Sequence, residues 1–390
     1  MMKLTALSLL GLSLFAQRAS LTPKQIADGW LLLFDGETTH GWTQEGGAVW
    51  RVENGAIVTD AGDAGYLRTN MPFADYELSI EFKSPAEGNS GIFLRSKPGP
   101  QPHVSGYELN VLLGKEVKPE RRWLNLANDT TKEFKLKPDF WHRYDVTVRG
   151  PQWEVKLDGK KVITGNDTKS LMGHIGLQAN KGKPIAFRNI RIRPLGMQPI
   201  FDGKTLDGWQ EVKRPNVKAP PEWSARKGIL HVEKGPGQLE TKTEYADFIL
   251  SIDVRTNTQD PKLHPNSGIF FRGSANGFWT GYEVQIRNEF KNNDPRQPVD
   301  TGTGGLYFHV PAREVVSRDN EFFTYTVLAQ GRNIGTWING YPVTSWVDPH
   351  PEGTTVRNKQ AILKAGPIAL QAHDPTTNLD FRNLRIAVFP

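Results

Sequence analysis

The sequence predicts an all-β chain made of two tandem β-sandwiches, and three observations favour this fold class. Four motifs occur twice in the same order, short segments alternate between apolar and polar residues, and Asp-Gly and Asn-Gly pairs stand where hairpins would turn. Long helical periodicities are missing, whereas glycine and proline are frequent, at 38 and 27 of 390 residues. Antiparallel strands without crossover helices are typical of a two-sheet sandwich.

The repeat indicates two copies of one domain. Four motifs of the first copy return in the second: Leu33-Phe34-Asp35-Gly36 as Ile200-Phe201-Asp202-Gly203, Asn89–Arg95 as Asn266–Arg272, Gly106–Leu109 as Gly281–Val284, and Phe187–Ile192 as Phe381–Ile386. Solenoid repeats are several times shorter, so the chain is not a solenoid. We expect the first domain at residues 28–195 and the second at residues 198–390, joined by a short linker.

The first twenty residues have the layout of a secretory signal peptide. Met1-Met2-Lys3 gives a positive start, the apolar run Leu4–Phe15 is too short for a membrane span, and small residues follow up to Ser20. We therefore expect export to the periplasm or the extracellular space, and no later segment predicts a transmembrane span. Cysteine is absent from the sequence, which excludes disulfides and thiolate metal sites.

Two pairs of matched segments predict the strands of the sandwiches. Residues 76–82 and 248–254 each place apolar side chains at alternate positions, as expected for a sheet that packs on one side. Residues 143–148 and 324–328 form a second matched pair. Each member is followed by a hairpin with the turn Asp158-Gly159 or Asn339-Gly340.

Loop length and charge indicate where, and to what, the chain binds. The second copy is longer than the first, and its extra residues fall at 288–310 and 348–360. Extra loops on a rigid sheet often carry binding surfaces. The net charge of +6 comes from scattered basic residues, without the basic stripe and interleaved aromatics of a nucleic-acid groove. We expect no nucleic-acid partner.

Polar side chains on three predicted strands of the second copy could converge on one site. These candidates are Arg272, Glu283, Gln285, Gln371 and His373. The first copy has an arginine, glutamate and glutamine at the matching positions, but Asn180 replaces His373. A structural Arg272–Glu283 ion pair and a histidine satisfied within the core are the alternatives. Glu283 and His373 could also share a divalent metal ion.

Aromatic residues found only in the second copy are candidates for stacking on a sugar ring. Trp279 and Trp337 match Val104 and Lys156 of the first copy. A tryptophan whose counterpart is lysine is not expected to be buried, so both indoles predict a carbohydrate contact. Tyr307 ends the loop Gly304-Gly305-Leu306-Tyr307, which the first copy lacks.

Each repeat resembles the 3-keto-disaccharide hydrolase family, whose fold is similar to the concanavalin A-like lectin/glucanase jelly roll. The matching motifs of the second copy are Phe201-Asp202-Gly203 with Gly208-Trp209, Asn266–Arg272, Gly281–Gln285, Gly304–Tyr307, Trp337–Gly340, Leu370–Asp374 and Phe381–Asn383. The second copy matches along its whole length. The first copy lacks the Gly304–Tyr307 loop and the histidine, so we expect its site to be degenerate.

The resemblance implies cleavage of 3-keto-glycosides or 3-keto-disaccharides. A ketone at C3 acidifies the proton at C2, so a base can form an enolate and the group at C1 can leave, with later addition of water. We expect His373 or Glu283 to be the base and Arg272 to stabilise the enolate. Gln285, Gln371, Trp279, Trp337 and Tyr307 would hold the sugar.

Two other functions fit the same sequence. Both copies could be non-catalytic carbohydrate-binding modules, in which case glycans bind without turnover. A cell-surface adhesion role is a third alternative, although the sequence has neither a sorting signal nor a low-complexity stalk.

Overall fold

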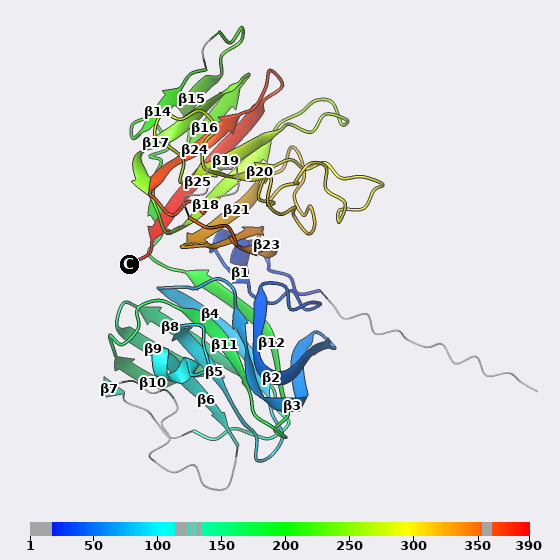
Figure 1. The fold of residues 1–390 in the computed structure, drawn as a ribbon, viewed down its shortest axis with the longest axis vertical. Helices are drawn as coiled ribbons and strands as arrows, with labels where there is room; N and C mark the ends of the chain where they lie inside the picture. The colour runs from blue at the N-terminus through cyan, green and yellow to red at the C-terminus, as the bar shows by residue number, and fades with distance from the viewer. Residues whose placement is uncertain are drawn as a thin grey trace, which may run out of the picture.

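The computed structural model describes residues 18–113, 124, 126, 128–129, 134–214, 216–352 and 361–390. Most of the expected signal peptide, and most of the expected loop at 348–360, lie outside these residues. Two stacked halves make up the molecule, and nearly every element is an antiparallel strand (Figure 1). The two helices of the described residues are short, α1 (Pro23–Ala27) and α2 (Pro102–Ser105). The all-β prediction is confirmed, and no described helix is both long and apolar enough to cross a membrane.

The N-terminal half is one twelve-stranded sheet that folds over into two layers. Strand β3 (Ala56–Thr69) links the layers, because its first residues pair with β12 (Ile185–Pro194) and its last residues pair with β11 (His174–Ala179). The remaining strands are β1 (Leu31–Leu32), β2 (Trp42–Glu53), β4 (Tyr76–Lys83), β5 (Asn89–Ser96), β6 (Tyr107–Leu112), β7 (Asn128–Asp129), β8 (His142–Arg149), β9 (Gln152–Leu157) and β10 (Lys160–Asn166).

The C-terminal half has the same strand order but two separate sheets. The five-stranded sheet runs β14 (Trp209–Val212), β17 (Gly237–Tyr245), β24 (Gly366–Ala372), β19 (Ser267–Phe271), β20 (Tyr282–Ile286). The eight-stranded sheet runs β15 (Glu222–Arg226), β16 (Ile229–Glu233), β25 (Asn378–Val388), β18 (Phe248–Thr256), β21 (Phe323–Gln330), β22 (Asn333–Ile338), β23 (Tyr341–Val347), and β13 (Gln198–Pro199) pairs with β25.

The core of each half lies between its layers. On β18, the alternate residues Phe248, Leu250, Ile252 and Val254 are all buried, which is the period-two pattern expected from the sequence. On β20, Tyr282, Val284 and Ile286 likewise point into the core. Glu283 and Gln285 therefore lie on the opposite face of the five-stranded sheet.

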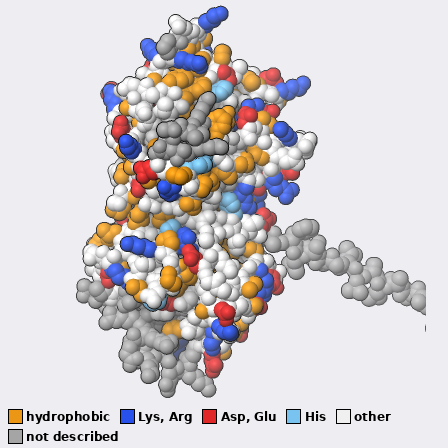
Figure 2. Space-filling model, viewed as in Figure 1, with side chains coloured by type: hydrophobic (Ala, Val, Ile, Leu, Met, Phe, Trp, Pro, Cys, Tyr) orange, Lys and Arg blue, Asp and Glu red, His pale blue; other side chains and the backbone are white. Residues whose placement is uncertain are grey.

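The two halves touch through β1 and the β22–β23 hairpin (Figure 1). The backbone N–H of Leu32 donates to the carbonyl of Gly340 at 2.8 Å. Arg313 forms an ion pair with Asp35 of the first half at 2.7 Å, and Asp35 is only 1% exposed. On the face shown in Figure 2, basic side chains are spread over both halves among acidic ones.

Candidate functional site

A cleft of about 260 Å³ opens on the outer face of the five-stranded sheet. Its floor comes from β19, β20 and β24, and its wall from the loop between β20 and β21. The residues that line the cleft are Asn266, Phe270, Trp279, Gly281, Glu283, Gln285, Asp300, Tyr307, Phe308, His309, Gln371 and His373. Six of the eight side chains predicted from the sequence thus meet in one place.

Glu283 lies across Gly268 of the neighbouring strand. A Cβ atom added at Gly268 would stand 2.5 Å from Glu283 Oε1, so only glycine leaves room for the carboxyl group. Burial raises the pKa of Glu283 to about 8, and a hydrogen bond with Gln371 acts in the opposite direction. The carboxyl group is therefore mostly protonated at neutral pH and can donate a hydrogen bond or a proton.

His373 is oriented by hydrogen bonds to both ring nitrogens. Its Nδ1 lies 2.8 Å from Asp374 Oδ2, and its Nε2 lies 3.3 Å from Asn266 Nδ2. Asn266 Oδ1 accepts from Gln285 Nε2 at 2.5 Å, which leaves the Asn266 amide nitrogen to donate to the imidazole. This network places the proton of a neutral His373 on Nδ1 and the lone pair on Nε2.

Asp374 remains an acceptor for this imidazole. Although burial acts to raise the pKa of Asp374, hydrogen bonds from Thr376 and His373 lower it overall, below its ordinary value. The ionised carboxylate favours the Nδ1–H tautomer of His373 and would stabilise the imidazolium that forms when Nε2 takes a proton.

Gln285 and Gln371 present unused acceptors beneath the cleft. Each residue is 2% exposed, and each side-chain oxygen is buried without a hydrogen-bond partner in the structure. A buried polar atom without a partner costs free energy, and these two lie on residues that line the cleft. Hydroxyl groups of a ligand would satisfy both oxygens.

Two aromatic residues frame the cleft. The indole ring of Trp279 is parallel to the His373 imidazole, with ring centroids 5.5 Å apart and an interplanar angle of 7°. The backbone N–H of Trp279 donates to Gln238 Oε1 at 2.9 Å, which fixes the loop that carries it. On the other wall, Tyr307 is held by its backbone N–H, which donates to the Glu283 carbonyl at 2.9 Å.

Arg272 does not reach the cleft, so the expectation that it stabilises the enolate there is wrong. Its side chain is fully buried and donates to the carbonyls of Ala246, Gly331 and Ile362 and to Asp247. Arg272 has a φ of +57°, so the strand alternation ends before it and the side chain turns away from Glu283. Arg95 makes matching contacts in the first half, which identifies this arginine as scaffold.

Trp337 is also absent from the cleft, contrary to the expectation of an exposed stacking ring. The residue is 4% exposed, and its Nε1 donates to the carbonyl of Leu32 at 2.9 Å. The counterpart Lys156 has no neighbouring domain above it, whereas Trp337 lies under the first half. Contact between the halves therefore explains the exchange of lysine for tryptophan.

Comparison with known proteins identifies the family to which the chain belongs. The family described as 3-keto-alpha-glucoside-1,2-lyase-like domain matches residues 29–193 and again residues 196–387. The chain belongs to this family. A 3-keto-disaccharide hydrolase of Bacteroides thetaiotaomicron is 37% identical over 79 residues, which are 17% of this chain and 27% of that protein. The chain thus matches about a quarter of the length of this relative.

Two of the solved structures with similar folds are bacterial proteins. A protein described only as a candidate glycosyl hydrolase from Parabacteroides distasonis is 22% identical, with a TM-score of 0.40 over 46% of this chain and 100% of that one. A carbohydrate-binding module, CBM66 from Bacillus subtilis, is 16% identical, with a TM-score of 0.31 over 39% of this chain and 95% of that one.

Several residues of the cleft in this family member were not predicted. They are Asn266, Phe270, Asp300, Phe308 and His309. His309 stacks on Trp346 with centroids 4.7 Å apart, and burial lowers its pKa. His309 and Asp300 lie in the extra loop of the second copy, so a search for titratable residues in that loop could have found them.

The described residues contain no group of three histidine, aspartate or glutamate side chains close enough to hold a metal ion. Glu283, His373, Asp300 and His309 all line the cleft, but no three of these side chains stand close enough together to hold a metal ion. The described side chains of the cleft do not fit a conventional protein metal centre.

Proposed function

We propose that the second half cleaves 3-keto-glycosides or 3-keto-disaccharides by proton removal at C2 and elimination at C1. The observation that carries this proposal is that one cleft holds an imidazole oriented at both ring nitrogens, His373, and a buried carboxyl group, Glu283. The lone pair of His373 lies on Nε2, where the Asn266 amide donates to it and a substrate would have to displace that bond, whereas burial keeps Glu283 protonated at neutral pH. Such a pair can serve as base and acid in one reaction.

The proposed reaction needs no group beyond these two and the substrate. His373 Nε2 takes the C2 proton, the C2–H electron pair moves to form the enolate, and the negative charge collects on the C3 oxygen. When the enolate collapses, the C1–O bond breaks and the leaving oxygen takes the proton of Glu283. Water adds later to C1 of the unsaturated product in a net hydrolysis, or the product leaves as it is.

The cleft also supplies binding contacts for such a sugar. The indole of Trp279, stacked on His373 and Phe278, lines the cleft with its ring edge, and the orphan oxygens of Gln285 and Gln371 would accept hydrogen bonds from ring hydroxyls. Among the described residues that line the cleft, no lysine or arginine is present. Donation to the enolate oxygen would therefore come from neutral donors of the cleft other than Glu283, whose proton goes to the leaving oxygen.

The first half would support the second rather than catalyse. Asn180 takes the place of His373, and its Nδ2 already donates to the Asn89 carbonyl at 3.1 Å and to Gln178 Oε1 at 3.2 Å. An amide cannot serve as the base. We also propose that the protein is exported, on the basis of the N-terminal sequence.

The test is to incubate the full chain with a chromogenic 3-keto-glucoside and to measure release of the aglycone. His373→Asn copies the residue of the first half, and we expect it to lower kcat by about 10²-fold or more while sugar binding is kept. His103→Asn, at an exposed position of α2, is the control and should keep full activity. Binding of the substrate without any turnover by the natural sequence would instead favour a carbohydrate-binding module.

A further inference from the structure

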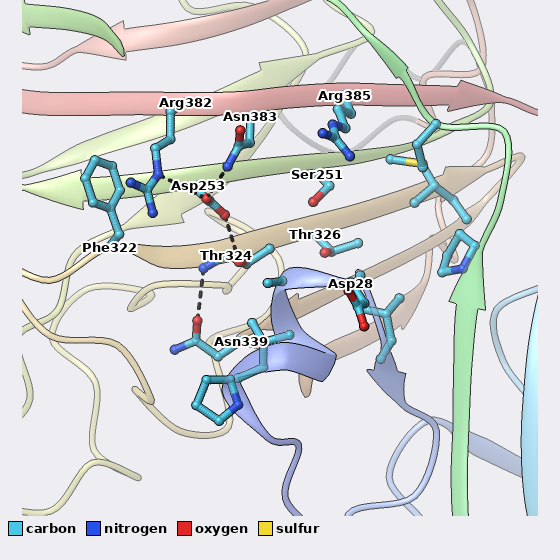
Figure 3. A pocket seen from close by; sticks show the side chains of 18 residues that line it. Asp28, Ser251, Asp253, Phe322, Thr324, Thr326, Asn339, Arg382, Asn383 and Arg385 are labelled. Atoms are coloured by element: carbon cyan, nitrogen blue, oxygen red, sulfur yellow. Dashed lines mark hydrogen bonds and ion pairs between the residues drawn. The ribbon is translucent and has the colours of Figure 1, made fainter. Parts of the chain in front are cut away.

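A second cavity, larger than the cleft, lies where the first half meets the outer face of the eight-stranded sheet. This groove has a volume of about 540 Å³, within the usual range for small-molecule sites. One side is formed by α1, β1 and the linker, and the other by β18, β21 and β25 (Figure 3). None of its lining residues belongs to the cleft described above.

A row of three polar side chains crosses the floor of the groove. Ser251 of β18 is the direct strand partner of Arg385 on one side and of Thr326 on the other. Side chains of such cross-strand partners lie about 5 Å apart on the same face of the sheet. Figure 3 shows Arg385, Ser251 and Thr326 in this row.

All three side chains of this row lack a partner in the structure. Thr326 is only 4% exposed, lines the groove, and has no hydrogen bond from its hydroxyl group. Ser251 has none either, and no described carboxylate forms an ion pair with Arg385. The two carboxylates nearby are already engaged: Asp253 with Arg382, Asn383 and Thr324, and Asp28 with Lys24.

The first half provides a comparison within the same molecule. The matching row is Arg191, Ser79 and Asp145, in the same strand register. There, Asp145 forms its ion pair with Arg143 at 2.9 Å, and its charge also favours the charged form of Arg191, although burial is the larger influence and lowers the pKa of Arg191. In the second half Thr326 replaces this aspartate, so Arg385 stands beside two hydroxyl groups and lacks the carboxylate found in the first half.

We propose that the groove binds a carboxylate-bearing saccharide, with the carboxylate of a hexuronate unit bound by Arg385, Ser251 and Thr326. A guanidinium and two hydroxyl groups can donate together to one carboxylate, and such charge-assisted bonds are strong. The rest of the groove suits a sugar ring: α1 and Met197 present apolar surface, and the amide nitrogen of Asn339, which has no partner, can donate to a hydroxyl group.

The test measures binding of glucuronate and of a digalacturonate to the full chain by calorimetry, with glucose and acetate as comparison ligands. We expect saturable binding of the uronates, and weaker or no binding of glucose and acetate. Arg385→Gln should weaken uronate binding by about tenfold or more, because charge-assisted hydrogen bonds are lost. His373→Asn should leave uronate binding unchanged, which separates this site from the proposed catalytic one.

Thr326→Asp is the matched variant, because it recreates the row of the first half and gives Arg385 an internal partner. We expect it to abolish uronate binding while the thermal unfolding midpoint is kept. Should this variant fail to fold, the exposed Arg385→Gln substitution still decides the question. The proposal is overturned if uronates do not bind saturably, if Arg385→Gln binds them normally, or if acetate or glucose binds as tightly as they do.

Discussion

At the scale of single residues, the carboxyl group of Glu283 links the chemistry of the cleft to the stability of the fold. Its pKa is raised by burial from 4.5 to about 8. Between these values the folded state holds a proton that the unfolded state has released. The free energy of unfolding therefore falls as pH rises through this range, because the ionised form is poorly accommodated in the fold.

Glu283→Gln should remove this part of the pH dependence. We expect the variant to lose less thermal stability than the natural sequence between pH 6 and pH 9, since the amide has no charge to bury. The measurement is the unfolding midpoint at each pH. Glu244→Gln, at an exposed position of β17, is the control and should decline like the natural protein. Parallel pH curves for all three proteins would contradict the raised pKa.

The raised pKa of Glu283 also predicts how kcat depends on pH on the alkaline side. If protonated Glu283 is the acid for the leaving group, kcat should fall as pH rises above about 8. Glu283→Gln should lower activity strongly at neutral pH and lose this limb, because an amide cannot deliver the proton. A pH–rate profile of Glu283→Gln that matches that of the natural protein would exclude this role.

Individual residues also show where sequence reasoning succeeds and where it fails. Strand alternation predicted that Glu283 and Gln285 share a face, since both lie inside a regular strand. The same rule failed for Arg272, because a left-handed backbone conformation at that residue breaks the alternation. Single-residue departures from strand geometry are set by the surroundings and leave little signal in the sequence.

At the scale of elements, the contact between β19 and β20 explains why a glycine recurs in both copies. Gly268 and Gly91 are each overlaid by the glutamate of the next strand, Glu283 or Glu108. A Cβ atom at Gly91 would stand 2.6 Å from Glu108 Oε1, as close as at Gly268. The glycine of the repeated Asn-Ser-Gly motif therefore leaves space for the glutamate side chain of the neighbouring strand.

The pair offers a matched experiment. Gly268→Ala should displace the Glu283 carboxyl group and reduce kcat/KM by about tenfold or more, because small misplacements of catalytic groups are costly. Gly91→Ala imposes nearly the same steric change on the first half, so it should alter the unfolding midpoint similarly but leave activity intact. Equal activity of the two variants would show that the position of Glu283 is not critical.

The sequence predicted where the long loop between β20 and β21 occurs, but it did not predict the path of that loop. Its extra length was evident from the comparison of the two copies. Its path depends on contacts such as Gln285 N–H to the Gly305 carbonyl at 2.9 Å, which join segments distant in sequence. Such contacts have no local periodicity, so His309 and Asp300 escaped prediction.

At the scale of the whole molecule, the repeated Phe-Asp-Gly motif contributes to the contact between the two halves in one of its copies. Asp35 and Asp202 both accept hydrogen bonds from the backbone N–H groups two and three residues ahead. Of these two aspartates, only Asp35 also forms an ion pair with the other half, through Arg313, which lies in the loop between β20 and β21 that walls the cleft. Asp202 is exposed.

Asp35→Ala and Asp202→Ala should therefore differ by the cost of the ion pair. Both variants lose the local turn, but Asp35→Ala also leaves Arg313 without its carboxylate. We expect it to lower the free energy of unfolding by roughly 1–3 kcal/mol more than Asp202→Ala. Urea unfolding of the full chain measures the difference. Equal losses in the two variants would mean that the ion pair across the junction adds nothing.

The repeat predicted two copies of an all-β fold, but it could not predict how they meet. At the position of Trp337, the first copy has Lys156. Such an exchange is consistent with an exposed ligand site or with a covered interface, and both are common uses of tryptophan. Only the arrangement of the halves distinguishes them.

The burial of the Trp337 indole under Leu32 has a practical consequence for work on fragments. A truncated chain that begins at residue 198 would carry this ring, and the apolar strand around it, into water. Fragments of that kind tend to self-associate through the newly bared patch. Low activity of an isolated C-terminal fragment would then result from aggregation and not from loss of catalytic groups.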